Sequence, residues 1–170
     1  MKPLIINNFL DQPSFYHLKN TMLSNFVCWN FNQAIDYKDE EGDKFQFTHS
    51  FYKENEGFIS NVSHYGVINP ILEIIRPKEV VRIKANLLTR TQKIIPNTFH
   101  TDIGGNMGVI PYTTAIFYVN SNNGYTEFED GTIVESVENR WVSFPEDIKH
   151  RGTSCTDERV RVVINFNYLT

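Results

Sequence analysis

The sequence predicts a mainly β chain in which flanking helices support a double-stranded β-helix (jelly-roll) core. From residue 80 onward, short strand-like runs are separated by Gly, Asn and Pro, with no helical period and no internal repeat. His100 and Asp102 stand two positions apart, and such side chains share one face of a strand. The 47 residues between Asp102 and His150 can hold several further strands. A sheet that curls on itself would therefore bring His150 back beside the first pair.

The N-terminal part is expected to support this core from one face of the sheet. Residues 4–6 predict a short strand, and Asp11 can cap a helix that has Pro13 in its first turn. The apolar stripe of this helix would consist of Phe15, Leu18, Met22 and Leu23. A second helix is expected over residues 69–75, where a following proline limits its continuation.

The core strands are expected at residues 80–88, 113–120, 125–128, 141–145 and 159–168. Alternation along the last strand places three residues beside Arg161 toward the interior: Val163, Asn165 and Asn167. The opposite face would meet a hydrophobic layer through Val162, Ile164, Phe166 and Tyr168. With 170 residues, of which 41% are hydrophobic, the chain fits one domain, with support over about 1–78 and the jelly-roll core over about 79–170.

The candidate metal ligands are His100, Asp102 and His150. Two histidines and one carboxylate on one face of a metal leave the opposite positions open, an arrangement typical of non-haem Fe(II) oxygenases. A His-x-Asp pair alone is a weak signal, so its order and context matter. The remaining histidines, His17, His49 and His64, have no carboxylate or cysteine partner at ligand spacing and are interpreted as surface or core residues.

The context of the pair is a strand that ends in Tyr-Val-Asn120, then Gly-Tyr-Thr-Glu-Phe128, Phe-Pro145 and His150, with an arginine about ten residues later. Residues 80–170 therefore resemble the 2-oxoglutarate- and Fe(II)-dependent dioxygenases, in particular the small prolyl-4-hydroxylase-like members. The resemblance implies that His100, Asp102 and His150 bind Fe(II). It also implies 2-oxoglutarate and dioxygen as co-substrates, support of activity by ascorbate, and a hydroxylated product released with succinate and carbon dioxide.

Two arginines compete as the anchor for the distal carboxylate of 2-oxoglutarate, because Arg159 and Arg161 share a face of the predicted final strand. We favour Arg161, which the resemblance places at the anchor position and whose guanidinium can bind a carboxylate through two hydrogen bonds. Arg159 lies in a charged turn, where a solvated side chain is the simpler interpretation.

Three further residues are candidates for the co-substrate pocket. By resemblance, the Tyr118 hydroxyl would donate to the distal carboxylate, although a core tyrosine with a satisfied hydroxyl is the alternative. Asn86 could face the co-substrate or the substrate, but a lone strand asparagine is more often structural, and the best-known prolyl hydroxylases carry a tyrosine near this place. Asn165 would line the interior beside Arg161.

Substrate identity is less constrained by the sequence. The net charge of −4 disfavours nucleic acid, with Arg82, Lys84 and Arg90 as a modest counterweight. By resemblance, a peptidyl side chain such as proline comes first, then a free amino acid or other small metabolite, and a nucleobase third. A different class of protein stays open: a jelly-roll module, or a cupin-like protein, that binds metal without using 2-oxoglutarate.

Two segments are candidates for moving parts. The acidic residues 36–44 could form a substrate lid, and residues 91–98 precede the first ligand. Gly104 and Gly105 would allow a sharp turn beside the metal. The only cysteines, Cys28 and Cys155, predict free thiols in a reducing compartment. With no apolar stretch of membrane-spanning length and no secretory signal, we expect a cytoplasmic protein.

Overall fold

A computed structural model describes residues 2–35, 44–59, 66–103 and 112–170 of the chain. Most of the expected lid, His64, and the Gly104–Gly105 turn lie outside these residues. In chain order the elements are β1 (Leu4–Ile6), α1 (Gln12–Met22), β2 (Asn30–Asn32), β3 (Gln46–Lys53), β4 (Gly57–Phe58), the 3-10 helix η1 (Gly66–Ile68), α3 (Asn69–Ile75), β5 (Glu79–Thr89), β6 (Thr113–Tyr118), β7 (Tyr125–Phe128), β8 (Ile133–Glu135), β9 (Arg140–Pro145), β10 (His150–Gly152) and β11 (Val160–Leu169).

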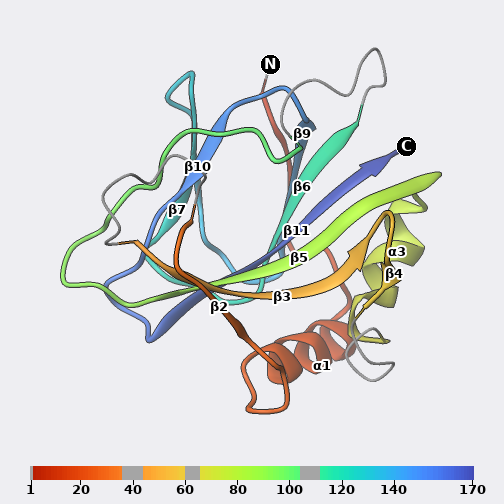
Figure 1. The fold of residues 1–170 in the computed structure, drawn as a ribbon, viewed down its shortest axis with the longest axis horizontal. Helices are drawn as coiled ribbons and strands as arrows, with labels where there is room; N and C mark the ends of the chain where they lie inside the picture. Colours follow the sequence, from red (N-terminus) through yellow and green to blue (C-terminus); the bar gives the residue numbers. More distant parts are fainter. Residues whose placement is uncertain (1, 36–43, 60–65, 104–111) are drawn as a thin grey trace.

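The strands form two antiparallel sheets that face each other (Figure 1). The larger sheet has eight strands, seven of them in the order β1-β9-β6-β11-β5-β3-β2, with β4 paired to β3. The smaller sheet has the order β10-β7-β8. Most neighbouring strands are non-consecutive in the chain, as expected when a chain crosses repeatedly between two sheets. The predicted jelly-roll core is confirmed, and it is joined at its edges by strands from the N-terminal part.

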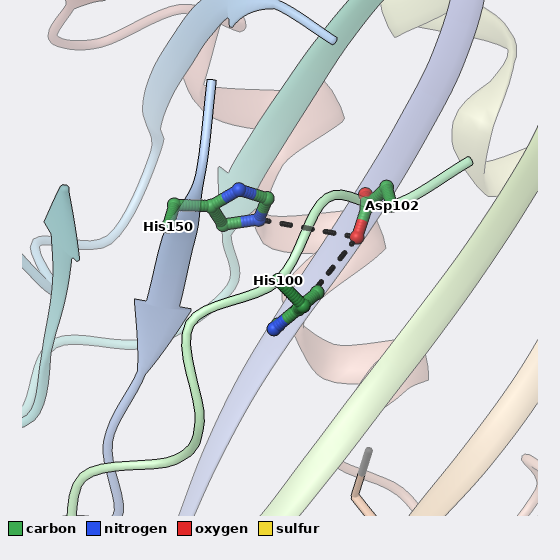
Figure 2. A group of neighbouring side chains, drawn as sticks. All are labelled: His100, Asp102 and His150. Atoms are coloured by element: carbon green, nitrogen blue, oxygen red, sulfur yellow. Dashed lines mark ion pairs between the residues drawn. The ribbon is translucent and has the colours of Figure 1, made fainter. Parts of the chain in front are cut away.

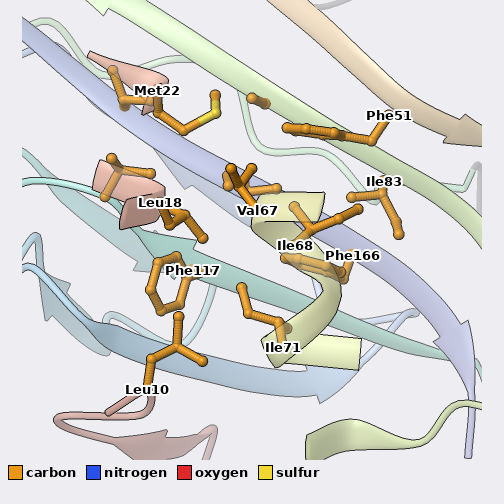
Figure 3. Packing of buried hydrophobic residues seen from close by; sticks show 14 of the residues in the cluster. Leu10, Leu18, Met22, Phe51, Val67, Ile68, Ile71, Ile83, Phe117 and Phe166 are labelled. Atoms are coloured by element: carbon orange, nitrogen blue, oxygen red, sulfur yellow. The ribbon is translucent and has the colours of Figure 1, made fainter. Parts of the chain in front are cut away.

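The helices cover the outer face of the larger sheet, as predicted (Figures 1 and 3). Helix α1 begins after Asp11, whose Oδ1 accepts a hydrogen bond of 3.1 Å from the backbone N–H of Ser14. The second predicted helix is confirmed as α3, and Arg76 ends it in the left-handed conformation, with φ of 46°. No helix in the described part of the chain is long and apolar enough to cross a membrane.

Figure 3 shows the hydrophobic layer between these helices and the sheet. The layer combines α1, η1 and α3 with one face of the long strands, through residues that include Leu10, Phe15, Leu18, Met22, Phe51, Ile68, Ile71, Ile83, Phe117, Val162, Ile164 and Phe166. Leu23 was wrongly included in the α1 stripe, since 42% of its surface is exposed. The helix ends at Met22, and the next residue lies about 100° further round the axis.

A second, smaller hydrophobic cluster lies between the two sheets. It contains Ile116, Tyr118, Phe128, Val134, Val142, Phe144 and Val163. Strand β11 therefore contributes to both layers by alternation: Val162 and Ile164 pack toward the helices, and Val163 packs toward the smaller sheet. The polar residues of the same inner face, Arg161, Asn165 and Asn167, are buried between the sheets, which places the candidate site there.

Candidate functional site

His100 and His150 are brought together by the backbone. They form an isolated antiparallel bridge in which the N–H of each residue donates to the carbonyl of the other at 3.0 Å. His150 begins β10, but the expectation that His100 and Asp102 share a strand is wrong, because Asp102 lies at a bend just beyond the bridge. The three side chains nevertheless converge, as Figure 2 shows, with one ligand atom from each within 4.8 Å of the others.

The two imidazoles are oriented by backbone carbonyls. The Nδ1 of His100 lies 3.0 Å from the carbonyl of Thr98, and the Nδ1 of His150 lies 3.3 Å from that of Ile148. Because a carbonyl oxygen only accepts, these contacts assign the ring proton to Nδ1 and leave the lone pair on Nε2. Both Nε2 atoms face Oδ1 of Asp102, at 3.6 and 3.9 Å. Histidines that bind a metal ion through one ring nitrogen commonly donate the other N–H to a carbonyl or carboxylate. The hydrogen bonds at Nδ1 therefore orient both imidazoles as metal ligands would be oriented.

The carboxylate of Asp102 presents one oxygen to the histidines and the other to the protein. Its Oδ2 accepts from the amides of Asn165 at 3.2 Å and Asn167 at 3.1 Å, and lies 3.4 Å from the guanidinium of Arg82. Burial by itself raises the pKa of this carboxyl, but the nearby imidazoles of His100 and His150 and the guanidinium of Arg82 lower it well below its usual range. Asp102 is therefore ionised, and its Oδ1 is oriented toward the two histidines.

Burial also acts on His150, whose surface is only 3% exposed. Desolvation lowers its pKa despite the opposing charge of Asp102. A neutral imidazole is the form that binds a metal ion, so burial favours the ligating state of His150.

Arg161 is a buried guanidinium with neutral partners. It leaves β11 between the two sheets, its surface is 3% exposed, and its Nε donates to Ser136 Oγ at 2.9 Å. One terminal nitrogen donates to Thr126 Oγ1 at 3.2 Å, and the group lies 5.8 Å from the ring of Tyr118. No carboxylate of the described residues is within ion-pair distance of it. Desolvation lowers the pKa of Arg161, which shows that burial costs its charged form free energy.

Tyr118 is placed beside Arg161 but turned to Thr126. Its hydroxyl donates to Thr126 Oγ1 at 2.7 Å, and burial raises its pKa. The cavity that Arg161 lines does not include Tyr118 among its lining residues. In this structure Tyr118 therefore orders Thr126, which in turn accepts from Arg161.

The two candidate anchors are clearly separated. Arg161 lies in β11 and is buried, whereas Arg159 precedes the strand and is exposed. The expectation that the two share a strand face is wrong, because β11 begins at Val160. Of the other candidates, Asn86 and Asn165 line the same cavity as Arg161, and the Oδ1 atom of each is buried with no hydrogen-bond partner among the described residues. Such atoms are costly unless a ligand or water satisfies them.

Two cavities meet at the metal ligands. The first, here called the Arg161 cavity, has about 540 Å³ counted to its open mouth and contains the three ligands, Arg161, Asn86 and Asn165 in its lining. The second, the Arg82 cavity, has about 780 Å³ and is lined by Asn32, Ala34, Ile35, Gln46, Arg82, Lys84, His100, Thr101 and Asp102. Lys84, His100 and Asp102 belong to both linings. The three candidate ligands can therefore be approached from two sides, one lined by Arg161 and the other by Arg82.

Sequence reasoning missed several residues of the site. Thr126 belongs to the Gly-x-Thr-Glu-Phe run and could have been found from it. Ser136 had no signal, because only the tertiary fold brings β8 to Arg161. Asn167 was placed on the correct strand face but not beside Asp102. Lys84 was considered only as part of the surface charge.

Similarity to known proteins is confined to three-dimensional structure. No family model matches the sequence, and no curated protein sequence matches it significantly. A 2OG-Fe(II) oxygenase family oxidoreductase from Burkholderia pseudomallei is similar with a TM-score of 0.68 at 8% identity, over 98% of this chain and 84% of that one. A viral collagen prolyl hydroxylase from Paramecium bursaria Chlorella virus 1, solved as a 2-oxoglutarate complex, has a TM-score of 0.65 at 12% identity over 100% and 97% of the two chains.

A third similar structure is a prolyl hydroxylase from Trichoplax adhaerens in complex with a hypoxia-inducible factor peptide fragment. Its TM-score is 0.65 at 12% identity, over 98% of this chain and 83% of that one. The chain thus has the fold of the 2-oxoglutarate- and Fe(II)-dependent oxygenases. Within that class its fold is prolyl-4-hydroxylase-like. At these identities the likeness concerns the fold, and the reaction has to be argued from the site.

Proposed function

We propose that this protein is an Fe(II)- and 2-oxoglutarate-dependent oxygenase that hydroxylates its substrate and releases succinate and carbon dioxide. His100, Asp102 and His150 would bind the iron, and Arg161 would bind the distal carboxylate of 2-oxoglutarate. The fold supports this proposal, but the observation that carries it is the environment of Arg161.

A buried guanidinium with only neutral hydrogen-bond partners is costly, because removal of a charge from water must be compensated by an opposite charge or by ample hydrogen bonding. Arg161 faces the cavity that also contains the three candidate ligands. A dicarboxylate that reaches from the metal to Arg161 would supply the missing charge, and a guanidinium suits a carboxylate geometrically. A module that only binds metal has no need of such a group.

The residues fit a ferrous ion and 2-oxoglutarate. Two imidazole Nε2 atoms and one carboxylate oxygen converge, and this donor set with open positions suits Fe(II). Bound iron, 2-oxoglutarate and dioxygen would supply the oxidising power for the attack on a C–H bond. The protein orients the ligands through Thr98, Ile148 and the asparagines of β11, and it orients Arg161 through Thr126 and Ser136. Such positioning and exclusion of water are the protein's part in cofactor chemistry.

A peptidyl side chain such as proline is the first candidate substrate. It is supported by the similar prolyl hydroxylase that was solved with a peptide fragment. A free amino acid or other small metabolite is the second candidate. It is favoured by the positively charged lining of the Arg82 cavity, to which Arg82 and Lys84 contribute.

The test is succinate formation from 2-oxoglutarate by the purified protein with Fe(II) and ascorbate. The wild type is compared with His100→Ala and with His17→Ala, since His17 is an exposed histidine of α1 and a matched control. We expect slow succinate formation that requires iron, is lost in His100→Ala and is kept in His17→Ala. Absence of succinate together with absence of 2-oxoglutarate binding would instead favour a metal-binding module.

A further inference from the structure

Lys84 is a partly buried lysine beside the candidate metal centre. It belongs to β5, where alternation places Arg82, Lys84 and Asn86 on the inner face of the sheet. Its cross-strand neighbour in β11 is Asn165, which donates to the metal-ligand carboxylate of Asp102. Lys84 therefore lies level with the metal centre, and it lines both the Arg161 cavity and the Arg82 cavity.

The ammonium of Lys84 has no hydrogen bond or ion pair with the described residues. Its neighbour Arg82 differs, since it donates to Asn167 Oδ1 at 3.1 Å and lies 3.4 Å from Asp102. Burial and the charge of Arg82 lower the pKa of Lys84 to about 8, although Asp102 acts in the opposite direction. A partly buried cation that has no partner among the described residues is costly, so its presence in a cavity wall calls for an anionic ligand.

The balance of charge around the candidate metal centre also indicates an anionic ligand at Lys84. Among the described residues that line the two cavities, Asp102 is the only acid, and the lysine and arginine side chains are Arg82, Lys84 and Arg161. Iron and Arg161 would be balanced by Asp102 and the 2-oxoglutarate dianion. The positive charges of Arg82 and Lys84 then remain in excess, although the chain as a whole carries a net charge of −4.

We propose that Lys84 binds a carboxylate of the substrate and so selects an acidic substrate for the oxygenase. This inference rests on the proposed function and narrows its substrate class. The carboxylate would enter from the Arg82 cavity, because Arg82 and Thr101 line only that cavity, whereas Arg161 lines only the other. Lys84 lies beside the metal ligands, so the bound carboxylate would hold a nearby C–H bond of the same molecule close to the metal.

The carboxylate can come from two sources. It can be the α-carboxylate of a free amino acid, or an acidic side chain within a peptide. Both present a carboxylate that can pair with the lysine ammonium, and both fit the substrate classes proposed above. Matched probes for each source distinguish a free amino acid from an acidic peptide.

The experiment measures binding to the full chain loaded with Zn(II) and N-oxalylglycine, an unreactive analogue of 2-oxoglutarate, by ligand-observed NMR. The first set of probes pairs free L-amino acids with their carboxamides. The second set pairs N-acetylated, C-amidated tripeptides that contain Glu or Asp with the same peptides that contain Gln or Asn. The proteins are the wild type, Lys84→Met, Lys84→Arg and the control Lys53→Met, which removes an exposed lysine of β3.

In one of the two sets, we expect the probes that carry the carboxylate to bind the wild type at least tenfold more tightly than the matched amides. Lys84→Met should lose this preference, while Lys84→Arg and Lys53→Met should keep it. The set that shows the preference identifies the source of the carboxylate. The proposal is overturned if no pair shows a preference, or if the preference persists in Lys84→Met.

Lys84 could instead bind the co-substrate, and the same proteins decide this. N-oxalylglycine affinity is measured first, and we expect less than a threefold change in Lys84→Met. A loss as large as that in Arg161→Ala would assign Lys84 to the co-substrate and overturn the proposal. If the wild type does not bind N-oxalylglycine at all, the proposed function fails. The probes are then titrated onto the Zn(II)-loaded protein, where the preference for carboxylates still tests Lys84.

Discussion

His100 and His150 are direct cross-strand partners, joined by two backbone hydrogen bonds of 3.0 Å. The spacing of the two imidazoles is therefore set by the backbone, and the side chains only need the correct rotamers. Their Nε2 atoms face the same oxygen of Asp102. A metal ion at this point would cross-link the bridge to the bend that carries Asp102, and it would bind the native state alone.

Metal should consequently stabilise the fold. With Zn(II) at about one hundred times its Kd, the gain is roughly 2.7 kcal/mol, which for a chain of this size raises Tm by about 5 to 10 °C. Differential scanning calorimetry of the wild type with and without Zn(II) measures this shift. His100→Ala should show little or none of it, whereas His17→Ala should show all of it. A full shift in His100→Ala would mean that the metal binds elsewhere.

Asn167 supports the candidate metal centre through its contact with Asp102. It donates to Asp102 Oδ2 at 3.1 Å and to Thr114 Oγ1 at the same distance. Asn167→Leu keeps the size of the side chain but removes the donor, so we expect metal affinity to fall about 10- to 100-fold. Competition with a chromophoric chelator measures the affinity.

The control for Asn167 is a buried asparagine with a backbone role. Asn120 donates to the carbonyl of Val160 and accepts from the N–H of Val162. Asn120→Leu should lower Tm but leave the metal affinity of the folded protein unchanged. Equal metal affinities in Asn167→Leu and the wild type would remove Asn167 from the site.

Arg161 and Arg159 can be separated by paired substitutions. Loss of a buried charged partner costs about 2 to 5 kcal/mol, so Arg161→Ala should weaken 2-oxoglutarate binding to the Zn(II)-loaded protein by about thirtyfold or more. Metal binding should persist, because Arg161 makes no contact with the three ligands. Arg159 is exposed, and Arg159→Ala should bind 2-oxoglutarate like the wild type. Calorimetric titration measures both, and the reverse result would move the anchor to Arg159.

Gly124 packs directly against Arg161. A Cβ at this position would lie 2.8 Å from Arg161 Cδ and 2.7 Å from the backbone oxygen of Ser154. Gly124→Ala must therefore displace the arginine side chain or the strand, and we expect weaker 2-oxoglutarate binding with metal binding retained. Gly131→Ala is a useful control, since a Cβ there meets no atom within 4 Å, although its φ of 83° adds strain. Unchanged 2-oxoglutarate affinity in Gly124→Ala would show that the anchor tolerates the shift.

Local patterns predicted those parts of the fold that local chemistry determines. The α1 cap at Asp11, the end of α3 and the alternation of β11 all follow from residues near each other in the sequence. Strands β2, β3, β4 and β8 were not predicted. All except β3 have at most three residues, and pairing with a neighbouring strand determines such short strands more than their own composition does.

In the candidate site, too, local sequence patterns predicted some features, whereas those that depend on tertiary contacts were missed. The three candidate ligands and the candidate anchor Arg161 were chosen from spacing and resemblance, but the residues that surround them were not predicted. Ser136 reaches Arg161 from 25 positions away, and Asn167 reaches Asp102 from 65 positions away. Lys84 is the clearest example, because a charged residue in a strand is normally exposed, and only the tertiary fold makes it a partly buried cation.

The pKa of Lys84 predicts how stability depends on pH in the metal-free protein. The folded-state pKa of about 8 is below the model-peptide value of 10.5, so the unfolded chain binds more protons between these values. The burial penalty is fully present below pH 8 and disappears as the pH rises toward 10.5. Its size is on the order of 3 kcal/mol. Lys84→Met, which has no charge to bury, should be more stable than the wild type by up to that amount at pH 7.

Urea unfolding of both proteins between pH 7 and pH 10 measures this difference. We expect the gap between Lys84→Met and the wild type to shrink as pH rises, because the wild type loses its penalty. Lys53→Met should show a small gap that does not change over the same range, since Lys53 is exposed. If Lys84→Met is the less stable protein at pH 7, the ammonium already has a compensating partner in the folded chain, and a role in capture of a substrate carboxylate loses its physical basis.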